Sequence, residues 1–199
     1  MATATEITET VKGVWTWHAF EESIRTELFS TAVLSEDGLV IIDPIDASPS
    51  VLMRLGRLGP TVAIILTNGN HSRAAGRFRE RFSAPVFSHA EAVGELTLPV
   101  DGTLRMDRRV GGSLEVIDLQ GAGMGEIALL NTNGWIHFGD AVINLEDTGL
   151  AVLPPKYCID AQLLAVSLKA LPALSFHSAT FAHGSPIITD AHARICAML

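Results

Sequence analysis

The most chemically suggestive stretch of the chain is a polar turn between a strand-like run and a helix-like run. Residues 64–78 read IILTNGNHSRAAGRF, with hydrophobic residues before the turn and Ala and Arg after it. Loops in this position often carry metal ligands or catalytic groups. This turn offers the side chains of Asn68, Asn70, His71, Ser72 and Arg73. Neutral amide oxygens are weak zinc ligands and arginine is a permanent cation, so these residue types fit a metal poorly.

Bulk composition narrows the classes of function. The chain has 199 residues, of which 48% are hydrophobic, and we expect a single domain over residues 1–199. A net charge of −8 argues against nucleic-acid binding, which needs clustered Lys and Arg. No apolar run reaches the roughly 18 residues of a membrane span, and the N-terminus lacks the features of a signal peptide. Two cysteines without a CxxC motif favour a reducing compartment, so we expect a cytoplasmic protein.

Hydrophobic patterning predicts strands in both halves of the chain, with helices between and after them. Strands are expected at residues 13–20, 27–35, 39–44, 61–67, 84–89, 113–119 and 178–184. The Asn133-Gly134 pair predicts a hairpin within residues 127–138. Helices are expected at residues 48–59, 71–82, 90–96, 159–174 and 189–199. This order predicts an α/β fold: a four-layer αββα sandwich of two mixed β-sheets flanked by helices.

The order of elements and loops resembles the metallo-β-lactamase fold superfamily over nearly the whole chain. That family's strand-to-helix loop reads T-H-x-H-x-D-H-x-G-G, and residues 67–76 keep only its first threonine and last glycine. The four ligand positions of that loop hold Asn68, Asn70, Ser72 and Arg73. The chain is therefore similar to the family in its scaffold and departs from it in its metal ligands.

Further motifs extend the resemblance. In HFGDAVI, Asp140 falls where the family has the carboxylate that bridges two metals, and in FAHGSPI, His183 falls on the last ligand position. Ala122, in QGAGMGE, replaces a ligand histidine. The strand-terminal Asp43 of IIDP implies a residue at the floor of the site. The resemblance also puts two further side chains near the pocket: His89 and Glu126. The remaining histidines, His137 among them, are expected to be structural or exposed.

Two states of this site follow from the substitutions. If the loop turns the His71 imidazole inward, then His71, Asp140 and His183 form a two-histidine, one-carboxylate set that can hold one Zn, Fe or Mn ion. If His71 instead caps the helix or faces solvent, this ligand set is not formed. In a metal-free alternative, the Arg73 guanidinium replaces the metal charge and is expected to pair with Asp140, and the two asparagines of the turn to add hydrogen bonds.

The resemblance implies a hydrolase of esters, thioesters, lactams or lactones that uses an altered or mononuclear metal site. The alternative is a metal-free pseudoenzyme or small-anion binder on the same scaffold. A third possibility is a metal-free enzyme with His183 or His71 as general base. The substrate or ligand is expected to be a small molecule. Exposed apolar residues near the C-terminus make a homodimer possible.

Overall fold

The larger of two main sheets is built mostly from the first half of the chain. This computed structural model describes residues 2–106 and 108–199. In spatial order the strands of the larger sheet are β2 (Thr8–Val11), β3 (Val14–Glu21), β4 (Thr26–Leu34), β5 (Leu39–Ile42), β7 (Thr61–Leu66), β8 (Val86–His89) and β9 (Gly102–Leu104). Pairing is antiparallel from β2 to β5 and parallel from β5 to β9. The sheet is therefore mixed, as the sequence predicts.

The second main sheet comes from the second half of the chain. Its strands are β10 (Arg109–Val110), β11 (Leu114–Asp118), β12 (Ile127–Asn131), β13 (Trp135–Phe138) and β16 (Ser178–Phe181). The pairing is antiparallel except between β13 and β16, which run parallel. Two small sheets pair β1 (Thr3–Ala4) with β6 (Asp46–Ala47), and β14 (Val142–Leu145) with β15 (Gly149–Val152).

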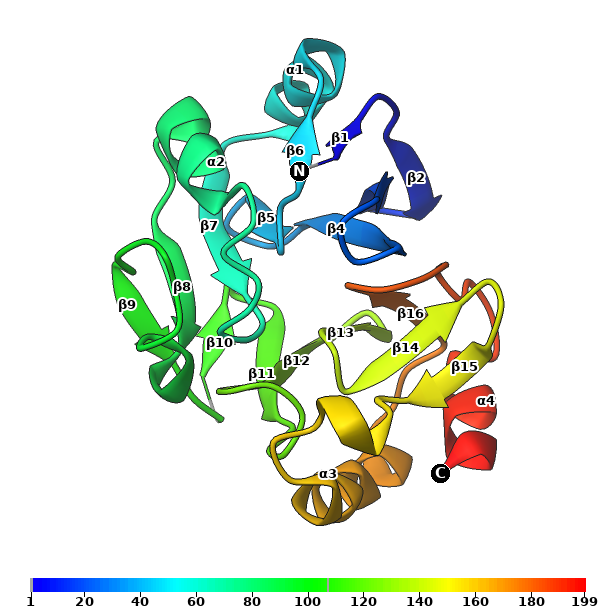
Figure 1. The fold of residues 1–199 in the computed structure, drawn as a ribbon. Helices are drawn as coiled ribbons and strands as arrows, with labels where there is room; N and C mark the ends of the chain where they lie inside the picture. Colours follow the sequence, from blue (N-terminus) through cyan, green and yellow to red (C-terminus); the bar gives the residue numbers. More distant parts are fainter. Residues whose placement is uncertain (1, 107) are drawn as a thin grey trace.

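Helices cover the outer faces of the two main sheets. Helices α1 (Pro49–Leu58) and α2 (Ala75–Phe82) lie at one end of the view in Figure 1, and α3 (Ala161–Ser167) and α4 (Ala191–Met198) lie at the other. Short 3₁₀ segments are η1 (Ala90–Ala92), η2 (Pro155–Tyr157) and η3 (Leu168–Ala173). The arrangement is the predicted αββα sandwich. No helix among the described residues is long and apolar enough to cross a membrane.

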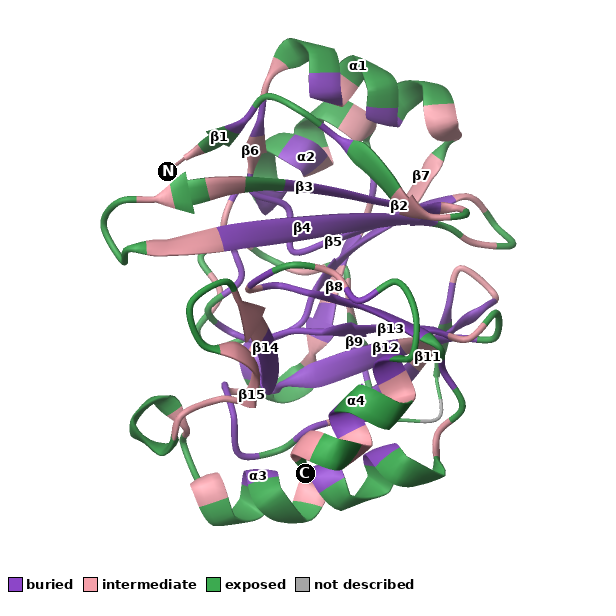
Figure 2. Cartoon of the chain, turned by 90° about the vertical axis from the view of Figure 1, so that its right-hand side faces the viewer, coloured by how far each residue is buried: buried purple, intermediate pink, exposed green. Residues whose placement is uncertain are grey.

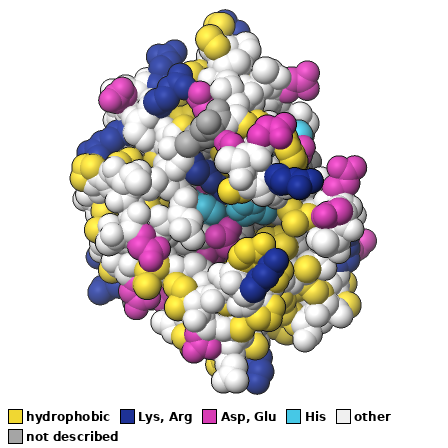
Figure 3. Space-filling model, viewed as in Figure 1, with side chains coloured by type: hydrophobic (Ala, Val, Ile, Leu, Met, Phe, Trp, Pro, Cys, Tyr) yellow, Lys and Arg dark blue, Asp and Glu magenta, His cyan; other side chains and the backbone are white. Residues whose placement is uncertain are grey.

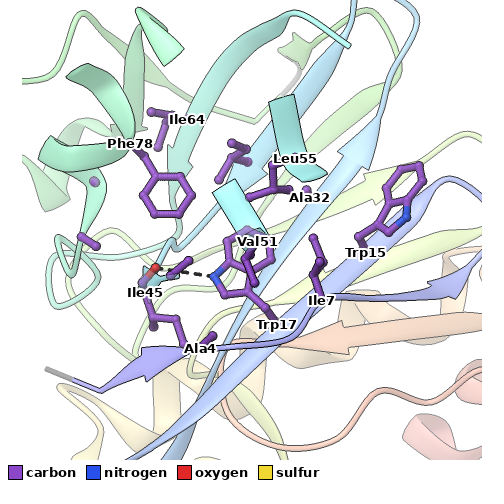
Figure 4. Packing of buried hydrophobic residues seen from close by; sticks show 14 of the residues in the cluster. Ala4, Ile7, Trp15, Trp17, Ala32, Ile45, Val51, Leu55, Ile64 and Phe78 are labelled. Carbon is purple, nitrogen blue, oxygen red and sulfur yellow. Dashed lines mark hydrogen bonds between the residues drawn. The ribbon is translucent and has the colours of Figure 1, made fainter. Parts of the chain in front are cut away.

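Three hydrophobic clusters fill the spaces between these four layers. Aliphatic side chains such as Val40, Ile65 and Leu129 pack between the sheets. A second cluster lies under α1 and α2, where the fully buried Trp17 stacks on Phe78 and donates a hydrogen bond to the Ile45 carbonyl (Figure 4). The third lies under α3 and α4. Figure 2 shows the result: the central strands of the two main sheets are buried along most of their length, and the helices expose their outer faces.

Most predicted elements are present, and the departures have local causes. The hairpin at Asn133-Gly134 is confirmed, with Gly134 at φ 80°. The helix expected from residue 71 begins only at Ala75, because Arg73 has a left-handed φ of 33° that interrupts a helix. The helix expected over residues 159–174 divides into α3 and η3, and Pro172 lies inside the second part. The β14–β15 hairpin was not predicted.

Candidate metal centre

The predicted site residues come together where parallel strands of both sheets end. Asp43 follows β5 and the polar turn follows β7, while Asp140 follows β13 and His183 follows β16. In α/β sheets, ligands commonly bind at the carboxyl ends of parallel strands. Figure 3 shows a hollow near the middle of this face, with histidine, acidic and basic surface gathered in it. The fold therefore brings polar and charged side chains from distant parts of the chain to one site.

Three of the predicted residues form a cluster of potential metal ligands. Asp140 Oδ1 lies 3.2 Å from His71 Nε2 and 3.2 Å from His183 Nε2. One ligand atom from each of the three residues lies within 4.8 Å of the other two. The His71 side chain is only 3% exposed and so does not face solvent, and no described side chain caps the start of α2. The loop has turned its imidazole inward, the first of the two predicted states.

Asp43 determines the orientation of the His71 ring. Asp43 Oδ2 lies 2.9 Å from His71 Nδ1 and accepts a hydrogen bond of 2.6 Å from the Thr67 hydroxyl. Asp43 Oδ1 accepts a further bond from the Thr67 backbone N–H. Asp43 itself has a left-handed φ of 47° directly after β5. Such strained backbone costs about 1–3 kcal/mol and is concentrated at functional sites. A buried carboxylate thus holds the Nδ1 side of His71 and leaves Nε2 facing the cluster.

The charges of the cluster shift the pKa values of its members. Burial and the Arg73 guanidinium disfavour a charged His71, but Asp43 and Asp140 outweigh them and raise its pKa to about 9. Burial would raise the pKa of Asp43 and of Asp140; His71 nevertheless leads the interactions that hold both pKa values well below the usual range. Burial lowers the pKa of His183. In the absence of metal, His71 is therefore an imidazolium between two carboxylates.

Asn68 occupies a position where the family has a ligand histidine, and it acts here as a hydrogen-bond donor. Its amide nitrogen donates to Asp140 Oδ2 over 3.0 Å and to Glu126 Oε2 over 2.7 Å. Asp140 therefore presents one oxygen to Asn68 and the other to the two histidines. Burial and the adjacent Asp140 raise the pKa of Glu126 to about 8, so this carboxyl group is largely protonated at neutral pH.

Arg73 lies in the same cluster, but the expected pair with Asp140 is not formed among the described residues. Its Nη1 donates to the carbonyls of Phe29 and Asp43, at 2.8 and 3.2 Å. Its Nη2 lies 3.2 Å from His71 Nε2 and 3.3 Å from His183 Nε2. Backbone carbonyls of Phe29, within β4, and of Asp43, directly after β5, hold the guanidinium on the imidazole side of the cluster. The prediction located Arg73 in the site correctly and assigned it the wrong partner.

The donor set fits one divalent ion in number and type, and it does not fit two. Two imidazoles and a carboxylate are a recognised set for Zn, Fe or Mn with open positions. Ala122 is buried and offers no donor atom, and the Asn68 amide nitrogen is directed at carboxylates. The Ser72 hydroxyl accepts a hydrogen bond from the Thr97 N–H, and Asn70 is exposed. The positions for a three-histidine site are therefore lost.

The two remaining predicted pocket residues line a small cavity beside the cluster. The cavity has a volume of about 170 Å³ and includes His89, Glu126 and the glycine turn at residues 121–125. Glu126 connects this cavity with the ligand cluster, since its Oε1 accepts hydrogen bonds from the backbone N–H groups of Asp140 and Ala141. His89 also accepts a bond from the Glu91 N–H at the start of η1, so it has a capping role as well.

One residue near the site was missed from the sequence. His137, expected to be structural or exposed, is fully buried in β13, with Nε2 3.6 Å from Asp43 Oδ2. Its strand is buried on both faces, so hydrophobic periodicity gave no signal about which side the imidazole occupies.

Comparisons with known proteins agree with this architecture. A sequence model described as the metallo-beta-lactamase superfamily matches residues 10–198. No curated protein gave a significant match. Among solved structures, a metallo-beta-lactamase from Pontibacter korlensis is 15% identical, with a TM-score of 0.75 and 96% of each chain covered.

Two further solved structures have the same fold. A metallo-beta-lactamase family protein from Thermus thermophilus is 19% identical with a TM-score of 0.71, covering 95% of this chain and 79% of its own. An archaeal superfamily protein from Sulfolobus tokodaii is 15% identical with a TM-score of 0.69, covering 92% and 83%. These identities support the fold, and the match of the sequence model covers nearly the whole chain. The chain therefore belongs to the metallo-β-lactamase superfamily.

Proposed function

We propose that this protein is a hydrolase that uses a single divalent metal ion held by His71, Asp140 and His183. The observation that carries the proposal is the convergence of one ligand atom from each residue within 4.8 Å. The three residues come from loops far apart in the sequence, so their meeting is a property of the fold. His71 replaces, from a neighbouring position of the loop, the ligands that Asn68 and Asn70 cannot supply.

Residues around the three ligands support such a site. Asp43 contacts His71 Nδ1 at 2.9 Å, a contact that keeps Nε2 toward the cluster. Asn68 holds Asp140 Oδ2 and leaves Oδ1 toward the histidines. Metal-binding histidines commonly donate their other ring N–H to a carboxylate or carbonyl, which orients the ring and raises its basicity. Asp43 is suited to this role.

Access to the cluster fits a small substrate. Asp140 is 15% exposed and His183 is 18% exposed, so both ligands can be reached from solvent. A bound divalent ion would activate water and polarise the scissile carbonyl of an ester, thioester, lactone or lactam. Glu126, beside Asp140, has a pKa of about 8 and can hold a proton near neutral pH.

The proposal is tested by measuring metal content and hydrolysis together. Protein expressed with Zn, Fe or Mn supplements is expected to retain close to one equivalent of metal by mass spectrometry. It is expected to hydrolyse at least one member of a panel of chromogenic esters, thioesters, lactones and lactams. His183→Ala should lose both properties. His18→Ala, at an exposed histidine paired with Glu27, is the matched control and should keep both. Wild-type protein that retains no metal under any supplement contradicts the proposal.

A metal-free protein is the second candidate, and the position of Arg73 favours it. The guanidinium contacts both imidazole nitrogens that a metal would need. Two cations, Arg73 and protonated His71, already balance the carboxylates of Asp43 and Asp140. Arg73 Nη1 and Nη2 both have acceptors within the protein, so a role in binding a small anion has less support. Under this candidate, wild-type protein stays metal-free and fully folded.

A further inference from the structure

We infer that His137 is a positioning residue for His71, acting through Asp43. The inference deepens the proposed function, since it concerns how the same site holds one of its ligands. His137 lies on β13 in the second sheet, whereas Asp43 and His71 follow strands of the first sheet. The polar row therefore crosses the interior of the sandwich.

The row is a series of close contacts, in which the one between His137 and Asp43 is longer than a hydrogen bond. Thr180 Oγ1 lies 2.9 Å from His137 Nδ1, and the two residues are register partners on the parallel strands β16 and β13. His137 Nε2 lies 3.6 Å from Asp43 Oδ2, which in turn lies 2.9 Å from His71 Nδ1. Beyond it, His71 Nε2 lies 3.2 Å from Asp140. The order is thus Thr180, His137, Asp43, His71, Asp140.

Burial determines how His137 can interact. The side chain is fully buried, and burial lowers its pKa, so the imidazole is neutral and carries one ring proton. A lone pair on Nε2 would face the negative charge of Asp43. Placing the proton on Nε2 avoids that repulsion and lets Nδ1 accept a hydrogen bond from the Thr180 hydroxyl. This tautomer is assigned from the surroundings of the ring.

The long contact has a specific effect on Asp43. At 3.6 Å the His137 Nε2–H group provides electrostatic stabilisation and leaves Asp43 Oδ2 free to accept short bonds from Thr67 and His71. Three donors therefore converge on one oxygen. With Asp43 held in this way, the His71 proton on Nδ1 has a fixed acceptor and Nε2 has a fixed direction. Residues behind a metal ligand often contribute about 10–100-fold to metal affinity.

A purely structural His137 would only fill space between Trp135 and the neighbouring strands. The two roles are separated by variants that keep volume or keep the donor. His137→Phe preserves a buried ring and removes the N–H group, whereas His137→Gln can return an amide N–H toward Asp43. Thr180→Val removes the hydroxyl that fixes the His137 tautomer. Trp135→Phe, on the same face of β13, is a control for altered packing.

The first measurement is made on metal-free protein and does not depend on metal binding. In NMR spectra of ¹⁵N-histidine-labelled wild type, we expect the His71 Nδ1–H signal to lie downfield and its proton to exchange slowly with water. His137→Phe should broaden it or accelerate its exchange at least tenfold, Thr180→Val should do so to a smaller extent, and His137→Gln and Trp135→Phe should retain it. An unchanged His71 signal in a folded His137→Phe protein would overturn the inference.

The second measurement is zinc affinity by competition with a chromogenic chelator. We expect His137→Phe to weaken zinc binding about tenfold or more and His137→Gln to recover most of that loss. Equal weakening in His137→Phe and Trp135→Phe would mean that packing alone is responsible and would overturn the inference. If wild type binds no zinc, the proposed metal site fails, and the NMR comparison still decides the role of His137.

Discussion

Arg73 Nη2 lies 3.2 Å from His71 Nε2, so a permanent cation contacts a nitrogen of the candidate metal site. The same Nη2 lies 3.3 Å from His183 Nε2. A metal ion needs the lone pair of each Nε2 atom, whereas the adjacent guanidinium repels a second cation, and the Nε2 of protonated His71 must lose its proton before it can bind a metal. Arg73 and a metal ion therefore compete for the same two histidines, and the balance between them decides the state of the protein.

The Arg73→Met variant is expected to bind zinc more tightly than wild type. Loss of the guanidinium removes a like charge from beside both imidazoles, and we expect zinc affinity to rise about tenfold or more. The metal-free protein should lose about 2–4 kcal/mol of stability, because bonds to buried carbonyls are lost. Zinc titration and urea unfolding measure the two effects.

Arg77→Met is the control for Arg73→Met. Arg77 is on the exposed side of α2 and pairs with Asp46 at the surface, where an ion pair contributes about 0–1 kcal/mol. Its substitution should leave zinc affinity unchanged. Competition at the two histidines would be contradicted if Arg77→Met bound zinc more tightly than wild type. It would also be contradicted if Arg73→Met bound zinc no more tightly than wild type.

Stability of the metal-free protein is expected to fall between about pH 6.5 and pH 9. The pKa of His71 is raised from 6.5 to about 9, so its contribution is fully present below pH 6.5 and is lost as the pH rises through 9. The pKa of Glu126 is raised from 4.5 to about 8, so its contribution to stability is also lost as the pH rises, over a lower pH range than that of His71. We expect a loss of about 1–3 kcal/mol, on the scale of 1.36 kcal/mol per pKa unit. Urea unfolding with a chelator present measures this loss. A free energy of unfolding that stays constant from pH 6.5 to 9 would contradict the prediction.

Asn68→Asp should destabilise the metal-free protein strongly. The change replaces a donor by a carboxylate beside Asp140 and Glu126, and we expect a loss of about 2–4 kcal/mol. Added zinc should restore part of this stability, since it neutralises the added negative charge. Asn70→Asp, two positions along the same turn and exposed, should change stability by less than about 0.5 kcal/mol. Similar losses in both variants would show that the turn, and not the contact with the carboxylates, is responsible. Thermal unfolding with and without zinc distinguishes the outcomes.

Gly184→Ala is expected to disrupt the site through the backbone. Gly184 has φ 96°, and an added Cβ would collide with the Asn144 carbonyl oxygen. Since Gly184 follows His183, the resulting shift should displace this ligand and cost about 2–4 kcal/mol. Gly76→Ala, in α2 with no atom within 4 Å of the added Cβ, should stabilise the protein by about 0.5–1 kcal/mol. Chemical unfolding of the two variants compares them, and a neutral Gly184→Ala would be inconsistent with this geometry.

The sequence predicted the fold well because its signals were local and repeated. Strand patterns, the Asn133-Gly134 turn and the glycine after His183 each follow from short-range chemistry. The position of His71 was left open, because the turn depends on the left-handed backbone at Arg73, which residue types alone do not reveal. His137 was missed since β13 is buried on both faces. The partners of Arg73 could not be predicted, because they are backbone carbonyls in and after strands that are distant in the sequence. The cytoplasmic location and a homodimer remain predictions.

The central claim is that His71, Asp140 and His183 hold one divalent ion, and anomalous diffraction tests it most directly. Crystals grown with zinc and measured at its absorption edge should show a single strong peak, about 2.0–2.2 Å from both histidine Nε2 atoms and an Asp140 oxygen. The Arg73 guanidinium should have moved off the two imidazoles. The absence of a peak at these residues, with Arg73 still in contact with both histidines, would contradict the claim and establish the metal-free state.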